Sequence, residues 1–222
     1  MLVLPRAEDI AYFDACGGAP EAPLIAWAET LISPSDAFVD VGAHIGSWSL
    51  YFALRGHHVH AFEAHPELAG FVHDGAALNH VSDRVSVEAC AIGDHDGSVI
   101  WRNPMNSESG GGGSIVCDYR GTAVDHLTVP MRTLDSFGFE HFGSRRVGLL
   151  KIDVEGAESL VLAGAGGLLR QHNPILLFEA WENWRGTGES PNEKLFALLK
   201  ELNYDARKTT WHETWVADSR NP

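Results

Sequence analysis

A short apolar run that leads into a glycine turn constrains this 222-residue chain more than any other feature. Residues 37–46 read Ala-Phe-Val-Asp-Val-Gly-Ala-His-Ile-Gly, and the apolar stretch 37–41 predicts a buried strand. Trp48, Tyr51 and Phe52 at helical spacing predict a helix directly after the turn. The two glycines let the backbone approach a ligand, and the helix start offers unpaired N–H groups. This arrangement is typical of a nucleoside-cofactor site.

A second acid narrows the choice of cofactor. Glu63 follows the apolar run 57–62, where the second strand of such a unit usually holds a ribose diol. The turn lacks the dinucleotide fingerprint, because Ala43 and His44 stand where a middle glycine would admit a pyrophosphate. S-adenosylmethionine has no phosphate, and its ammonium and sulfonium suit acids such as Asp40. The sequence therefore favours S-adenosylmethionine over NAD, and a strand-turn-helix unit without a ligand stays an alternative.

Strand and helix patterns alternate along most of the chain. Apolar runs predict strands at 85–91, 147–153 and 174–179, with helical patterns between them. This order predicts an α/β fold, a doubly wound and mostly parallel sheet with helices on both faces. The predicted helices cover 66–78, 158–165 and 191–202, and two short strands follow at 204–209 and 214–218.

Four acids fall at the ends of predicted strands, namely Asp40, Glu63, Asp153 and Glu179. Ligands of doubly wound sheets bind outside the carboxyl ends of the strands, so these acids should share one rim. Like charges on one rim repel each other unless cationic groups, a metal or hydrogen bonds compensate. Asp153 and Glu179 could jointly hold a hard cation such as Mg²⁺, and the use of a metal stays open.

The domain organisation is predicted to be simple. Residues 36–222 form a single domain, preceded by a packing or lid helix within 1–35. The strand-helix alternation is interrupted over 93–133, where two strands flank a loop that contains the run Gly110-Gly111-Gly112-Gly113-Ser114. Such a run is typical of a mobile segment, and a mobile linker and a lid over the ligand are equally compatible with it.

The composition limits the partners and the location of the protein. A formal net charge of −14 opposes binding to a phosphate backbone, so the expected acceptor is a neutral or cationic small molecule. No apolar run approaches the roughly 20 residues of a membrane span. The start of the chain lacks the features of a secretory signal, and three widely spaced cysteines indicate reduced thiols. We therefore expect a cytoplasmic protein, while its oligomeric state is not predictable from these data.

Four motifs in order give the chain a family resemblance. They are Val39–Gly46, Ala61–Pro66, Thr133-Leu134-Asp135 and Leu150-Lys151-Ile152-Asp153-Val154-Glu155-Gly156-Ala157-Glu158. Over roughly residues 36–182 the chain resembles the FkbM family of S-adenosylmethionine-dependent methyltransferases. The resemblance implies a class I methyltransferase (Rossmann-like) fold and methyl transfer to a hydroxyl of a polyketide, sugar or related natural product. The sequence departs from the family in His44 and Ala64, where asparagine and proline are more common.

Methyl transfer to a hydroxyl requires alignment of the acceptor and removal of its proton. Asp153 is the first candidate, either for binding the cofactor ammonium or for proton removal, and Glu155 and Glu179 follow. A plainer reading makes Asp153 a helix cap, and Glu158 a charge that complements the helix dipole. The predicted cofactor contacts are Asp40, Gly42, Ala43, His44, Gly46, Glu63, Ala64, Ala91 and Asp153. Two rival functions stay open, an NAD-dependent oxidoreductase and a non-catalytic S-adenosylmethionine-binding module.

Overall fold

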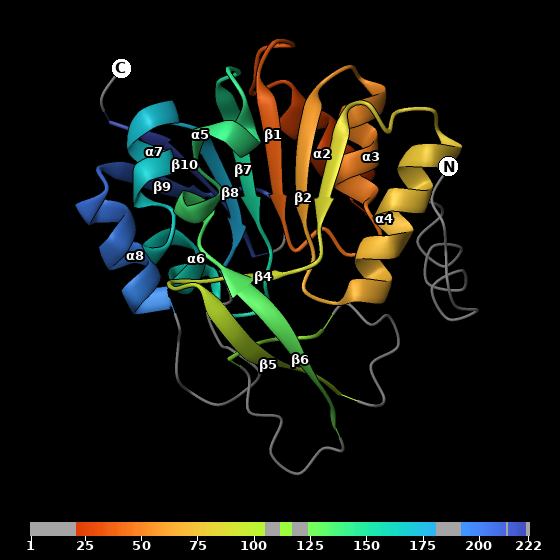
Figure 1. Cartoon of the computed structure of the whole chain (residues 1–222). Helices are drawn as coiled ribbons and strands as arrows, with labels where there is room; N and C mark the ends of the chain where they lie inside the picture. The colour runs from red at the N-terminus through yellow and green to blue at the C-terminus, as the bar shows by residue number, and fades with distance from the viewer. Residues whose placement is uncertain (1–20, 105–111, 117–123, 181–191, 212, 221–222) are drawn as a thin grey trace.

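A seven-stranded sheet forms the centre of the protein (Figure 1). The computed structural model describes residues 21–104, 112–116, 124–180, 192–211 and 213–220. The strand order is β3-β2-β1-β7-β8-β10-β9, and β10 runs antiparallel to both of its neighbours while the other pairs are parallel. The predicted α/β fold with a mostly parallel sheet is therefore confirmed. The strands are β1 (Ala37–Val41), β2 (His58–Phe62), β3 (Val85–Glu88), β7 (Val147–Ile152), β8 (Ile175–Glu179), β9 (Tyr204–Lys208) and β10 (Thr214–Ser219).

Helices cover both faces of this sheet, because side chains of the central strands alternate between two apolar cores. Phe38 and Leu149 pack with α2 and α3 on one face, whereas Val39 and Leu150 pack with α5 to α8 on the other. All four side chains have no solvent-exposed surface. The helices are α2 (Ala22–Glu29), α3 (Ser47–Leu54), α4 (Pro66–Leu78), α5 (Leu134–Phe142), α6 (Glu158–Ala163), α7 (Gly166–His172) and α8 (Asn192–Glu201). The sequence patterns had not predicted α5 and α7.

The inserted segment forms a second sheet beyond the carboxyl edge of the first (Figure 1). This sheet consists of β4 (Ala91–Ile92), directly before the insertion, and of β5 (Gly97–Pro104) and β6 (Val124–Arg132) within it, in the order β4-β6-β5. The prediction of one strand over 85–91 was wrong, since the chain turns at Cys90, whose N–H donates to Glu88 O at 3.1 Å. After this turn β4 leaves the large sheet and pairs with β6.

The described residues include only parts of the predicted N-terminal helical segment and of the predicted glycine-rich loop. The helix expected within 1–35 is α2, which contacts α3, while residues 1–20 lie outside the described ranges. Gly110 and Gly111 of the glycine run also lie outside them. Ser114, at the end of that run, is buried and bridges to Arg102 of β5. Of the helices in the described ranges, none has the length and apolarity needed to cross a membrane.

Gly164, at the end of α6, lies against the backbone next to the small sheet, and a substitution there tests this arrangement. A Cβ at Gly164 would lie 2.0 Å from Gly93 O, a backbone atom next to β4. We predict that Gly164→Ala lowers the free energy of unfolding by about 1–3 kcal/mol, because the two backbones must separate. Gly70→Ala is the matched control, since its new Cβ in the middle of α4 would have no atom within 4 Å apart from the neighbouring residues and the backbone of its own helix. It should stabilise the protein slightly. Denaturant unfolding of both variants measures the difference, and equal stabilities would contradict the prediction.

Candidate active site

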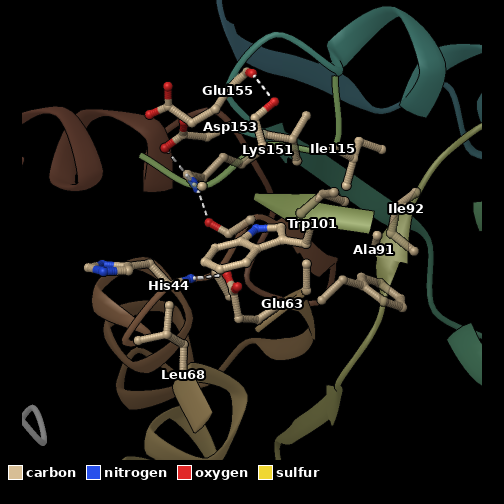
Figure 2. Close-up of a pocket in the computed structure, with 18 of the residues that line it drawn as sticks. His44, Glu63, Leu68, Ala91, Ile92, Trp101, Ile115, Lys151, Asp153 and Glu155 are labelled. Carbon is tan, nitrogen blue, oxygen red and sulfur yellow. Dashed lines mark hydrogen bonds and ion pairs between the residues drawn. The ribbon is translucent and has the colours of Figure 1, made fainter. Parts of the chain in front are cut away.

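A cavity lies at the carboxyl edge of the large sheet, where the strand order reverses between β1 and β7. Such a switch point is the usual ligand site of a doubly wound sheet. In Figure 2, Ala91, Ile92 and Ile115 lie to one side of this cavity, His44 and Asp153 lie to the other, and Trp101 lies between them. Eight of the residues singled out from the sequence line it: Gly42, Ala43, His44, Glu63, Ala64, Ala91, Asp153 and Glu155.

The turn after β1 brings β1 and β7 into close contact. Gly42 has φ 81°, and a Cβ there would lie 1.8 Å from Asp153 O. The N–H of Asp153 donates to Val41 O at 3.0 Å. Any side chain at Gly42 would therefore push apart the two strand ends that form the floor of the cavity. His44, in the same turn, has φ 52°, a conformation that is uncommon outside glycine.

Glu63 is fixed by the backbone on both of its carboxylate oxygens. Its Oε2 accepts the N–H of His44 at 2.8 Å, and its Oε1 accepts the N–H of His65 at 2.9 Å. The side chain is only 7% exposed, and it faces the cavity (Figure 2). A carboxylate oxygen accepts more than one hydrogen bond, so Glu63 can receive a ribose diol while these contacts persist.

The buried ammonium of Lys151 compensates the acids of the rim. Its Nζ lies 2.9 Å from Gly42 O, 3.1 Å from Asp40 Oδ1 and 3.5 Å from Asp153 Oδ2. Burial alone would favour the neutral amine, but the carboxylates of Asp40, Asp153 and Glu21 raise the pKa of Lys151 above its ordinary value. Lys151 is thus the compensating group that the rim acids need, and no pattern in the sequence identified it.

The side chain of Glu158 holds the backbone of the loop that carries Asp153 and Glu155. Glu158 Oε1 accepts the N–H groups of Val154 at 3.3 Å and Gly156 at 3.2 Å. Glu158 is buried at the start of α6, so it does more than complement a helix dipole. The capping interpretation of Asp153 was wrong, because the N-cap of α6 is Ala157, without a side-chain cap.

The small sheet adds a wall that the sequence analysis missed. Trp101 of β5 lines the cavity and packs so closely on Gly113 that a Cβ there would lie 1.8 Å from its ring. Ser114 Oγ donates to Glu155 O at 2.7 Å, which ties this wall to the acidic loop. Glu21, before α2, was also missed, since no motif surrounds it. Trp101, Ala64 and Ala91 together form an apolar slot in the lining of the cavity.

Three of the predicted site residues do not line this cavity. Asp40 is fully buried beneath it and accepts hydrogen bonds from Lys151 and from Ser49 Oγ at 2.7 Å. Its carboxylate is satisfied by the protein, so the expected direct cofactor contact is replaced by support of Lys151. Gly46 has φ 87° and lies against Val72 of α4. Its role is therefore in helix packing.

Glu179 lines a smaller hollow beside the cavity. This hollow also contains Leu24 of α2, Phe178 of β8 and Thr214 of β10. Asp153 borders both spaces, which places Asp153 and Glu179 around one hollow, as the sequence analysis expected for two rim acids. Within the part of the chain that the structure describes, no group of three or more His, Cys, Asp or Glu side chains is placed to hold a metal ion.

The comparisons with known proteins agree with this geometry. The model of the methyltransferase FkbM domain matches residues 40–206, which is most of the chain. The chain belongs to the FkbM family of methyltransferases. It is 27% identical over 212 residues to methyltransferase sdnD of Sordaria araneosa, covering 83% of this chain and 79% of that protein. The family resemblance inferred from the sequence is thus confirmed.

Solved structures share the fold. The FkbM methyltransferase of Methylobacillus flagellatus superposes with a TM-score of 0.54 at 20% identity, over 84% of this chain and 44% of that one. An O-methyltransferase of Bacillus cereus in complex with S-adenosylhomocysteine gives 0.52 at 14% identity, over 95% of this chain and 85% of that one. This chain thus spans less than half the length of the Methylobacillus protein.

S-adenosylmethionine is the cofactor of this methyltransferase, and the cavity fits it. Glu63 offers a fixed carboxylate to the ribose diol. The slot beside Ala64, Ala91 and Trp101 offers apolar surface to the adenine ring. Asp153 is 31% exposed on its side chain and offers a carboxylate to an ammonium. A dinucleotide would instead bring a pyrophosphate toward these carboxylates.

Glu63 provides the first test of the cofactor site. We predict that Glu63→Ala weakens S-adenosylhomocysteine affinity by roughly 10- to 100-fold, because a hydrogen bond to a charged group contributes about 1.5–3 kcal/mol. Calorimetric titration measures the affinity. Glu67→Ala is the matched control, since Glu67 is exposed in the first turn of α4 and outside the cavity. A folded Glu63→Ala protein with unchanged affinity would remove Glu63 from the cofactor site.

Glu158 predicts a specific dependence of stability on pH. Burial raises the pKa of Glu158 to about 7, although backbone N–H donors lower it. Between the unfolded pKa near 4.5 and about 7, the folded state holds a proton that the unfolded state has lost. The contribution of Glu158 to the free energy of unfolding therefore falls as pH rises through this window.

Glu158→Gln should remove this loss. The stability of the variant relative to the unaltered protein should rise by up to about 3 kcal/mol between pH 4.5 and a pH above 7. Denaturant unfolding across this pH range measures it. Glu193→Gln is the control, because Glu193 occupies the first turn of α8 but is exposed. If the free energies of unfolding of the two variants changed with pH in the same way, Glu158 would act only on the helix dipole.

Proposed function

We propose that this methyltransferase is an O-methyltransferase that acts on a hydroxyl of a small natural product, such as a sugar, a nucleoside or a polyketide. Such an activity would belong to the biosynthesis of an antibiotic or related secondary metabolite. The supporting observation is the shared border between the cofactor cavity and the hollow that Glu179 lines. A methyl donor and an acceptor must meet at one point, and carboxylates lie at this border.

The chain's own residues would divide the work as follows. S-adenosylmethionine supplies an electrophilic methyl group bound to sulfur. Glu63 would hold the ribose, and Asp153, which borders the smaller hollow, would bind the ammonium. Leu24 and Phe178 of that hollow offer apolar surface next to the border. Alignment of this kind supplies a large part of the rate enhancement, and a base placed near the acceptor hydroxyl adds about 10²–10⁴.

Charge supports a small acceptor over a nucleic acid. The formal net charge is −14, and the described rim carries several carboxylates against the single ammonium of Lys151. This field opposes a phosphate backbone and tolerates neutral or cationic molecules. Solved O-methyltransferases of Bacillus cereus and of Thermotoga maritima share the fold, with TM-scores of 0.52 and 0.51, and this likeness makes oxygen a reasonable acceptor atom.

Transfer of a labelled methyl group tests the proposal. The protein is incubated with methyl-labelled S-adenosylmethionine and a panel of monosaccharides, nucleosides and macrocyclic polyketides. We expect label in an O-methyl product, with the position assigned by mass spectrometry and NMR. An N- or C-methyl product would contradict the O-specific proposal. Binding of the cofactor without transfer to any member would favour the non-catalytic module. Binding of NAD in place of S-adenosylhomocysteine would favour the oxidoreductase, which the family assignment does not support.

A further inference from the structure

The cofactor cavity and the smaller hollow share four residues, and two of them lie outside every motif of the sequence. The four are Glu21, Trp48, Lys151 and Asp153. In a displacement reaction the acceptor oxygen lies behind the methyl carbon, so it loses its proton near the border of the two spaces. The group that receives the proton should therefore be among these four side chains.

Two of the four are unsuited to accept a proton. Trp48 has only an indole N–H to donate. Lys151 is already protonated, and three carboxylates raise its pKa. Asp153 has a carboxylate whose Oδ2 lies 3.5 Å from the ammonium of Lys151, and it is also the acid proposed above for the cofactor ammonium, so two cations would compete with a proton for it. Among the described residues, Glu21 is the remaining carboxylate at this border.

The surroundings of Glu21 suit a general base. Trp48 Nε1 donates to Glu21 Oε2 at 3.0 Å, which fixes the carboxylate at the border of the two spaces. Burial raises the pKa of Glu21, Lys151 partly opposes this change, and Asp153 adds to it. A carboxylate with a raised pKa binds a proton more strongly and works better as a base near neutral pH.

We propose that Glu21 is the general base of the methyl transfer. This proposal rests on the O-methyltransferase function proposed above. The acceptor oxygen forms a bond to the methyl carbon, the C–S bond breaks, and its electron pair stays on sulfur. The hydroxyl proton passes to Glu21 Oε1, the oxygen that does not accept the indole N–H. Asp153 then serves the cofactor ammonium and Lys151, so the two acids have separate roles.

The test compares Glu21→Gln with Asp153→Asn on the acceptors that the panel identifies. Glutamine keeps the size and an oxygen for Trp48 but binds no proton. We expect Glu21→Gln to bind S-adenosylhomocysteine with unchanged affinity and to lose about 10²- to 10⁴-fold in kcat near neutral pH. The fall of kcat toward acid pH should disappear in this variant. Asp153→Asn should instead weaken S-adenosylhomocysteine binding and keep the acid limb of the pH profile.

Two further measurements separate chemistry from structure. In Glu21→Ala, added acetate should restore part of kcat, because a small carboxylate can replace a missing base but cannot repair a misfolded site. Glu29→Gln, at the other end of α2 from Glu21 and outside both spaces, should keep the activity of the unaltered protein.

Several results would overturn the proposal. They are near-native kcat in Glu21→Gln, a parallel loss of S-adenosylhomocysteine binding in that variant, and no acetate rescue. Disappearance of the acid limb in Asp153→Asn would assign the base to Asp153. Absence of transfer by the unaltered protein to the whole panel is a separate result that overturns the O-methyltransferase function, and with it any base for that reaction.

Discussion

The buried ammonium of Lys151 is the interaction on which the site depends. It links the carbonyl of Gly42, the carboxylate of Asp40 and the carboxylate of Asp153, and thus the ends of β1 and β7. Removing one partner of a buried ion pair typically costs about 3–5 kcal/mol, because the other charge is left without compensation. The acids of the rim can lie this close together only because one cation is held among them. The cofactor cavity therefore depends on the positive charge of Lys151, which is neutralised by protein groups.

Hydrogen bonds to backbone groups fix the loops around Lys151 and its partners. Glu158 fixes the backbone of the loop that carries Asp153, and Ser114 fixes the carbonyl of Glu155 in the same loop. Glu63 holds the opposite side through the N–H groups of the turn and of His65. Each contact joins a side chain to a backbone group, so the cavity is shaped before any ligand enters. Preorganisation of this kind reduces the ordering that binding would otherwise require.

Much of this arrangement was predictable from local pattern. The strands that end in Asp40, Glu63, Asp153 and Glu179 were recognised because apolar runs that end in acids repeat along a parallel sheet. Pairings across the chain were not predictable in this way. The split of 85–91 into β3 and β4 depends on a turn at Cys90 and on a partner strand about 40 residues away. The direct contact expected of Asp40 failed because the pattern shows where a residue falls on a strand but not which neighbour satisfies it.

The position of Glu21 relative to the family domain has an evolutionary consequence. The matched domain covers 40–206, and it contains Glu63, Lys151, Asp153 and Glu158 but not Glu21. The residues proposed to hold the methyl donor, Glu63 and Asp153, therefore lie within the shared domain. The segment before it contributes Glu21 and, in the smaller hollow, Leu24. Under the proposed roles, exchange of that leading segment between relatives would replace the general base and one wall of the smaller hollow while Glu63 and Asp153 stay in place.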